Sequence, residues 1–86
     1  MRKILTYSLI LSIVISVKEL IENNVHALRT RENQTQETLA AALGVSRQTV
    51  IAIEKGNYTP SVLLALKISQ HFKTPLEKVF KIKYEK

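Results

Sequence analysis

The sequence of 86 residues contains no cysteine and no tryptophan, and only two glycines and two prolines. Without cysteine the chain has no disulfide framework, and its two histidines, His26 and His71, are too far apart in the sequence to suggest a zinc cluster. No glycine-rich phosphate cradle and no local nucleophile-and-base motif is present, so we expect no enzymatic activity, cofactor or metal site. The fold must therefore rest on the packing of side chains.

Length and charge narrow the class of protein further. A chain of 86 residues fits one small domain, in which partner subunits can help to complete a limited core. The net charge of +6 and the isoelectric point near 9.8 favour contact with a polyanion. Two of the positive charges, Arg2 and Lys3, stand at the start of the chain, ahead of the sequence motif at residues 35–58. The domain that contains this motif is therefore only mildly basic.

Two short apolar stripes at helical spacing flank Gly44. Their members are Leu39, Ala40 and Leu43 before the glycine and Val50, Ile51 and Ile53 after it. Gly44 stands where the chain must reverse, a position that favours a residue able to adopt a positive φ. Ser46 is a good N-cap for the second helix, and the small Ala40 would let the two helices cross closely. The pattern predicts helices over 35–43 and 46–55 joined by a tight turn.

Polar side chains occupy the first turn of the second predicted helix, where Arg47, Gln48 and Thr49 lie on its outer face. A helix fits the major groove of B-DNA, in which arginine can bond guanine, glutamine can bond adenine, and a threonine methyl can touch thymine. We therefore expect these three side chains to read bases. The alternative for Arg47 is that it is one more solvated surface charge.

The same stretch resembles the lambda-repressor-like, Cro-type helix-turn-helix family, also called the xenobiotic-response-element family of bacterial and phage regulators. Gln36, Ala40, Gly44, Val50 and Ile53 fall at the family's spacing, and the resemblance continues over roughly residues 23–80. So long a match is far more specific than a helix-turn-helix pattern alone. It implies an all-α, five-helix DNA-binding domain, which we place at residues 18–80.

The first predicted helix precedes the motif and spans Lys18 to Arg31, with a break at residues 32–34. We expect its apolar face to be buried through Leu20, Ile21, Val25 and Leu28. The resemblance implies that an arginine late in this helix, Arg29, pairs with Glu54 late in the third helix and thereby fixes that helix. Arg31 is a competing candidate for this role. We assign no function to His26 or His71, since single histidines on amphipathic helices are usually ordinary boundary residues.

Two further helices and a tail complete the predicted fold. Ser61 caps a fourth helix, whose Leu63, Leu64, Leu66 and Ile68 are expected to reach toward Phe72. Residues 74–77 fit a capping box with proline at the first helical position, which opens a fifth helix through Phe80. Residues 81–86 alternate charged and apolar side chains, so they form either a frayed tail, which we favour, or an edge strand that pairs with a symmetry mate.

Contacts to the DNA backbone are expected on both sides of the base-reading turn. The resemblance implies that Gln36, in the first turn of the second helix, contacts a phosphate. After the third helix the chain would pass a phosphate strand, so backbone contacts are favoured there. The expected backbone-binding residues are Gln36, Ser46, Lys55, Asn57 and Tyr58. For Tyr58 a structural role is equally compatible, as a lid over the junction between the third and fourth helices.

The segment before the domain is an apolar run over residues 4–17. As a helix it would reach ~21 Å at ~1.5 Å per residue, short of the ~30 Å hydrocarbon core of a bilayer. It also resembles the hydrophobic region of a signal peptide. Three explanations stay open, in order of preference: an over-long gene start whose true start lies near Val17, a membrane anchor, or an added dimerisation helix. Any membrane contact would be confined to this run.

Together these features predict a sequence-specific regulator that binds double-stranded DNA. We expect a homodimeric repressor that reads a partly palindromic operator with the helix over 46–55, in the bacterial cytoplasm and associated with the nucleoid. The alternative is an antitoxin-like or membrane-tethered protein-interaction module, in which the same fold binds protein in place of DNA.

Overall fold

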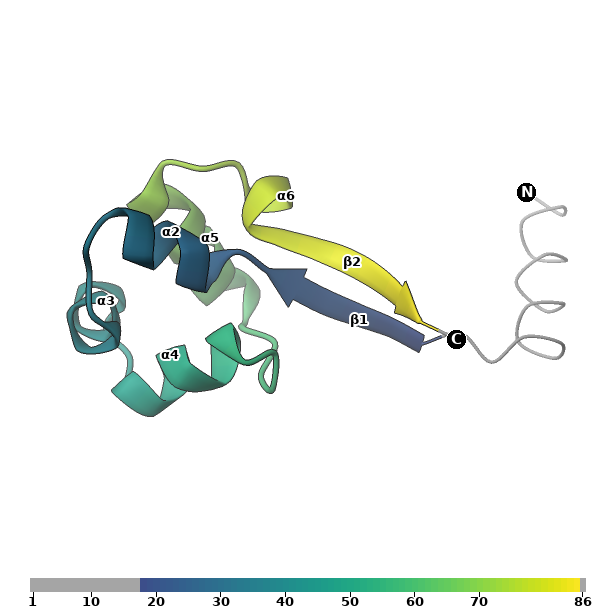
Figure 1. Cartoon of the computed structure of the whole chain (residues 1–86), viewed down its shortest axis with the longest axis horizontal. Helices are drawn as coiled ribbons and strands as arrows, with labels where there is room; N and C mark the ends of the chain where they lie inside the picture. The colour runs from purple at the N-terminus through teal and green to yellow at the C-terminus, as the bar shows by residue number, and fades with distance from the viewer. Residues whose placement is uncertain (1–17, 86) are drawn as a thin grey trace, which may run out of the picture.

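The computed structural model describes residues 18–85, and the apolar segment 1–17 with its three possible roles lies outside the described residues. The elements are β1 Lys18–Asn23, α2 Val25–Arg31, α3 Gln36–Leu43, α4 Arg47–Glu54, α5 Val62–Phe72, α6 Leu76–Val79 and β2 Phe80–Glu85. The five helices form one body, and the two strands form a ribbon that projects from it (Figure 1). None of the helices within residues 18–85 has the length and apolar character needed to span a bilayer.

The ribbon corrects two predictions. Residues 18–23, expected to begin the first helix, form β1, and the expected tail is β2, which pairs with β1 of the same chain in antiparallel register. Opposite charges face each other at Lys18 and Glu85 and at Glu22 and Lys81, and such cross-strand pairs stabilise a sheet. The fold is therefore mostly helical with a small two-stranded sheet, and the expectation of an all-α chain with a buried first-helix face is wrong over this segment.

The core forms where the five helices α2 to α6 meet, and each of them contributes at least one buried apolar side chain. Its most deeply buried large side chains are Leu39, Ile53, Ile68, Val25, Val50 and Val79. Each full burial of such a side chain contributes about 1.5–3 kcal/mol. Ala40 is buried at 3% exposure, as expected for a close crossing of α3 and α4, and Gly44 ends α3 with φ of 73°. The predicted turn between the two helices of the motif is confirmed.

Three predicted N-caps are present. The hydroxyls of Thr35, Ser46 and Ser61 accept hydrogen bonds from the backbone N–H groups three residues later. The predicted capping box at 74–77 is not formed, because the Thr74 hydroxyl donates to the Phe72 carbonyl and Pro75 itself precedes the first residue of α6. Phe80, expected to end that helix, begins β2, so α6 is a single turn.

On α5 only every fourth residue reaches the core. Leu64, Ile68 and Phe72 are buried, whereas Leu63 and Leu66 are 67% and 45% exposed. Since α-helical residues four apart share a face, the observed stripe follows from the helix geometry. The prediction that Leu63 and Leu66 also pack toward Phe72 is wrong, and these leucines are left on an outer apolar face.

Candidate nucleic-acid interface

Helix α4 presents its first turn to solvent. Arg47 and Gln48 are exposed, while Thr49 is half-buried. Ser46 Oγ accepts from the Thr49 N–H at 3.2 Å and lies 3.0 Å from Thr49 Oγ1, so the cap holds the start of the helix. Because the hydroxyls of Ser46 and Thr49 contact each other, Arg47 and Gln48 are the two side chains of this turn that project freely.

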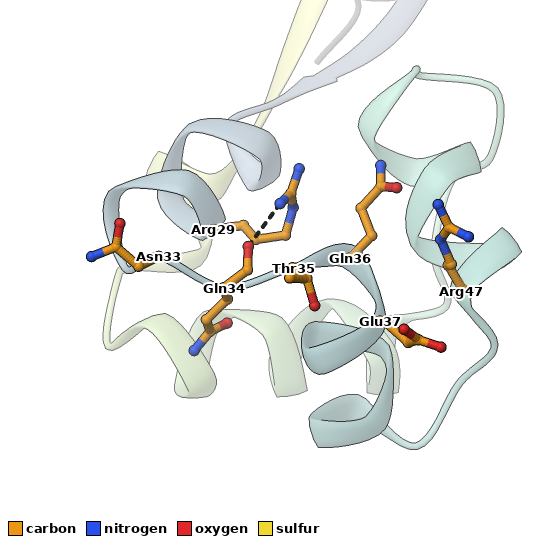
Figure 2. Close-up of a pocket in the computed structure, with 7 residues that line it drawn as sticks. All are labelled: Arg29, Asn33, Gln34, Thr35, Gln36, Glu37 and Arg47. Carbon is orange, nitrogen blue, oxygen red and sulfur yellow. Dashed lines mark hydrogen bonds between the residues drawn. The ribbon is translucent and has the colours of Figure 1, made fainter.

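A polar hollow opens beside this turn. It has a volume of about 540 Å³ and lies between the α2–α3 connection and α4, with Arg29 and Arg47 among its lining residues (Figure 2). The N-cap Thr35 and the first α3 residues Gln36 and Glu37 also line it. The start of α3 and the start of α4 therefore border one open surface, on which an extended polyanion can contact both.

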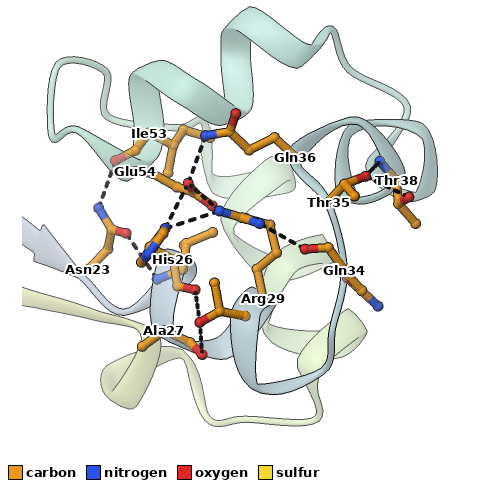
Figure 3. Close-up of polar contacts among 12 residues, drawn as sticks. Asn23, His26, Ala27, Arg29, Gln34, Thr35, Gln36, Thr38, Ile53 and Glu54 are labelled. Carbon is orange, nitrogen blue, oxygen red and sulfur yellow. Dashed lines mark hydrogen bonds and ion pairs between the residues drawn. The ribbon is translucent and has the colours of Figure 1, made fainter.

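Behind the hollow, Arg29 links three segments. Its Nε donates to Glu54 Oε2 at 2.6 Å and its Nη2 to Glu54 Oε1 at 3.2 Å, while Nη1 donates to the Gln34 carbonyl at 2.8 Å (Figure 3). Both partners of the ion pair are largely shielded, with side chains 10% and 5% exposed for Arg29 and Glu54. The arginine thus ties α2 to the connection before α3 and to the end of α4.

The structure distinguishes the two candidate arginines. Arg31 is 65% exposed in its side chain, and its Nη2 approaches only Glu32, at 4.0 Å. A helix rotates by about 100° per residue, so two positions beyond Arg29 the side chain points away from α4. Arg29, and not Arg31, is the residue that meets Glu54.

Glu54 also accepts from Gln36 Nε2 at 3.1 Å, and His26 Nδ1 lies 3.3 Å from the same carboxylate oxygen. Burial raises the pKa of Glu54, but hydrogen bonds from Arg29, Gln36 and His26, together with the charge of Arg29, outweigh burial and hold the pKa below its ordinary value of 4.5. The carboxylate is therefore ionised at neutral pH and fixes α4 as an anion.

His26 has two neighbours at the same nitrogen. Arg29 Nη2 lies 3.0 Å from His26 Nδ1, and because a guanidinium can only donate, this nitrogen accepts from Arg29 only when it carries no proton. A proton on Nδ1 would instead let the ring donate to Glu54. Sequence reasoning assigned His26 nothing, since its partner on α4 lies 28 positions away.

Gln36 and Asn23 both bind the end of α4. The Gln36 amide, expected at a phosphate, donates to Glu54, which leaves its remaining hydrogen and its backbone N–H for other partners. Asn23 Nδ2 donates to the Ile53 carbonyl at 2.8 Å and so joins the ribbon to α4 (Figure 3). Sequence reasoning missed Asn23, because no local pattern indicates a bond between residues 30 positions apart.

The remaining predicted backbone contacts lie at the opposite end of α4 from Arg47. Lys55, Asn57 and Tyr58 are all exposed in the loop that follows the helix, in which Gly56 has φ of 77°. Tyr58 is 45% exposed. The two groups of expected DNA contacts are thus separated by the length of α4, about 12 Å for eight residues at about 1.5 Å each.

Comparison with known proteins agrees with this geometry. A family model described as Helix-turn-helix matches residues 25–79. The HTH-type transcriptional regulator YgzD of Bacillus subtilis is 51% identical over 65 residues, which cover 76% of this chain and 98% of that protein. A regulator of the same type from Methanocaldococcus jannaschii is 52% identical over 60 residues, covering 70% of this chain and 91% of its own.

A solved structure is also similar. The restriction-modification controller protein C.AhdI from Aeromonas hydrophila superposes with a TM-score of 0.59 at 29% identity, over 64% of this chain and 83% of that one. Since the family model covers well over half of the chain and the relatives match it along nearly their whole length, the chain belongs to the Cro/C1-type helix-turn-helix family of DNA-binding transcriptional regulators.

Proposed function

We propose that the protein is a sequence-specific repressor that places α4 in the major groove of double-stranded DNA. The observation that carries the proposal is the exposure of Arg47 and Gln48 on the first turn of a capped helix whose inner face is buried. Their side chains have the donors and acceptors that pair with guanine and adenine edges. Because the helix is already ordered before binding, contacts from its first turn to bases carry no additional cost in conformational entropy for forming the helix.

The polar network gives α4 its fixed position. Val50 and Ile53 anchor its inner face in the core, and Glu54 ties its last turn to Arg29 and Gln36. Base recognition requires side chains placed to within about 0.5 Å, which depends on such supporting contacts. Arg29 and Glu54 therefore act in recognition by positioning the helix, with no contact of their own to bases.

Backbone contacts would supply most of the affinity. Phosphates can be reached by the N–H groups at the start of α3 near Gln36, by Ser46, and by Lys55, Asn57 and Tyr58 beyond α4. These contacts on both sides of α4 are compatible with a helix lying between two phosphate strands. The net charge of +6 favours such binding, and affinity should fall steeply with salt.

A single α4 offers few base contacts, which favours a homodimer on a partly palindromic operator. Two copies related by a two-fold axis would read half-sites about 10 bp apart, one helical turn along the same face of the DNA. Residues 18–80 carry every proposed DNA contact and form the unit that we assign to binding. Repression would follow from occupation of the operator by the dimer, in the cytoplasm and on the nucleoid.

To test this proposal, duplexes that bind the wild-type protein are first selected from a random library. The affinity of Arg47→Ala is then measured for the selected sequence and for its single-base variants. We expect a loss of about 1–3 kcal/mol on the selected sequence and relaxed preference at one base pair. Arg31→Ala is the matched control, because it removes the same charge from an exposed site away from α4. Equal loss on every sequence would make Arg47 a phosphate contact, and no binding of the wild type at low salt would favour a protein-interaction module.

A further inference from the structure

One carboxylate stands on the face that carries the proposed base-reading turn. Glu37, in the first turn of α3, is exposed and lines the polar hollow together with Arg47 at the start of α4 (Figure 2). Among the described residues that line this hollow, it is the only acidic one. A negative charge at this place opposes the DNA phosphates that the same surface is expected to meet.

The other carboxylates of the described chain are neutralised or lie elsewhere. Glu54 is held by Arg29 behind the hollow. The remaining glutamates are on the ribbon, at the end of α2 and on α6: Glu19, Glu22, Glu32, Glu77 and Glu85. Glu37 is therefore the carboxylate whose role the positioning of α4 by Glu54 does not explain.

Glu37 and Arg47 are opposite charges that face one hollow and are still unpaired. The ion pairs within residues 18–85 involve neither of them. Both side chains are exposed, so water screens their attraction in the free protein, where such a pair contributes little. When DNA covers the hollow and displaces water, the same attraction becomes stronger. We therefore expect the two side chains to pair in the DNA complex.

An arginine can bind a carboxylate and a second acceptor at the same time, because its guanidinium has five N–H donors in a fixed fork. Arg29 does so behind the hollow: its Nε and Nη2 donate to the two oxygens of Glu54, while its Nη1 donates to the Gln34 carbonyl. The same division of donors suits Arg47. One edge of its guanidinium can bind Glu37, and the other can donate to O6 and N7 of guanine.

We propose that Glu37 is a specificity-determining residue that positions Arg47 for a base. Its carboxylate binds one edge of the guanidinium when DNA covers the hollow and directs the other edge toward guanine. A phosphate that enters the hollow to bind Arg47 is repelled by the same charge. Glu37 thus weakens non-specific binding while it supports the recognition of one base pair. The inference rests on the proposed function, since it adds a second residue to the base-reading turn.

The experiment measures the affinity of the full chain for the duplex selected with the wild type, for its single-base variants and for a random duplex. Glu37→Gln removes the charge and keeps the size of the side chain. We expect its affinity for the random duplex to rise by about two- to fivefold, because a repulsion from phosphates is lost. We expect its preference at the base pair read by Arg47 to fall by at least about threefold.

Two further variants separate the charge of Glu37 from its effect on Arg47. Glu37→Asp keeps the charge, so its affinity for the random duplex should stay within about twofold of the wild type. In an Arg47→Ala background, Glu37→Gln should cause no further loss of preference at that base pair, because the side chain that it positions is absent. Thermal unfolding confirms that each variant folds.

Glu77→Gln is the matched control. Glu77 is the second residue of α6 as Glu37 is of α3, so each carboxylate interacts favourably with the dipole of its own helix. In Figure 1, however, α6 and α4 lie on opposite sides of the helical body. Glu77→Gln should therefore leave base preference unchanged and should alter the affinity for the random duplex by less than about twofold.

Three results would overturn the inference. If Glu37→Gln binds every duplex as Glu77→Gln does, Glu37 only stabilises the start of its helix. If preference falls at a different base pair, or still falls in the Arg47→Ala background, Glu37 does not act through Arg47. If Arg47→Ala itself keeps every base preference, both this inference and the proposed function fail, which distinguishes that case from the first two.

Discussion

Replacing Glu54 by glutamine should destabilise the protein strongly although it changes little in shape. The substitution removes the negative charge that faces the Arg29 guanidinium at 2.6 Å, while Arg29 keeps its place beside the core at 8% exposure. A buried charge left without its partner costs about 3–5 kcal/mol. Gln36 also loses a charged acceptor, since its amide donates to the same carboxylate.

The expected loss in the free energy of unfolding depends on how well the Arg29–Glu54 ion pair is shielded from solvent. With side chains only 10% and 5% exposed, solvent screens the Arg29–Glu54 interaction weakly, so the lower end of that range, about 3 kcal/mol, is expected. For a domain of this size each kcal/mol lowers the melting temperature by about 4–8 °C, which gives a decrease of about 12–24 °C. This is a large share of the free energy of unfolding of a small domain.

The assay is urea unfolding followed by circular dichroism for the wild type, Glu54→Gln, Arg29→Met and the double variant. The double variant has no unpaired charge, so its loss should be smaller than the sum of the two single losses by at least about 1 kcal/mol. Arg31→Met is the control, since that arginine is exposed and should change stability by less than about 0.5 kcal/mol. A Glu54→Gln protein as stable as the wild type, or strict additivity in the double variant, would refute the reasoning.

Three further predictions concern acid, caps and the turn. The pKa of Glu54 in the folded protein lies below its ordinary value of 4.5, so the stability that its carboxylate contributes is complete above pH 4.5 and is lost as the pH falls through the folded-state pKa. The difference in unfolding free energy between the wild type and Glu54→Gln should therefore shrink below pH 4.5. A difference that stays constant with pH would contradict this role of Glu54. Ser46→Ala should cost about 1 kcal/mol in urea unfolding, as should Ser61→Ala, because each removes an N-cap; an unchanged midpoint would refute the role of the cap. Gly44 has φ of 73°, and no atom lies within 4 Å of the position that a Cβ would occupy, so alanine there should cost about 1–2 kcal/mol from backbone strain alone and asparagine clearly less; equal losses would show that packing dominates.

Local signals predicted the helix-turn-helix itself. Ser46, Gly44 and the apolar stripe through Val50 each act within a few positions of the chain, and a cap or a positive φ is a property of a single turn. The exposed first turn of α4 follows from the same spacing, since burying Val50 and Ile53 directs Arg47 and Gln48 outward. The spacing of residues along the chain is therefore enough to place the proposed base-reading side chains on the outer face of α4.

The ribbon could not be predicted in this way. Residues 18–23 carry adjacent apolar residues, Leu20 and Ile21, which fit one face of a helix as well as they fit a strand. Their partner strand lies some 60 positions later, so only the folded body, which brings Asn24 to the carbonyl of Val79 at 2.9 Å, aligns the two. The same body leaves Leu63 and Leu66 on the outside, although the sequence alone ranks them with Leu64.

What the sequence determined by itself was the set of short-range features: the capped helices, the glycine turn and the polar first turn of α4, because each depends on neighbours within one helical turn. What only the tertiary structure decided was every pairing between distant segments. The resemblance implied the pair of Arg29 with Glu54 but left Arg31 as a competing partner, and the structure decided between them. The reach of His26 and Asn23 to α4 and the pairing of β1 with β2 also depend on residues more than 25 positions apart. Such contacts form only when packing of the core brings their elements together, so the spacing of residues along the chain does not predict them.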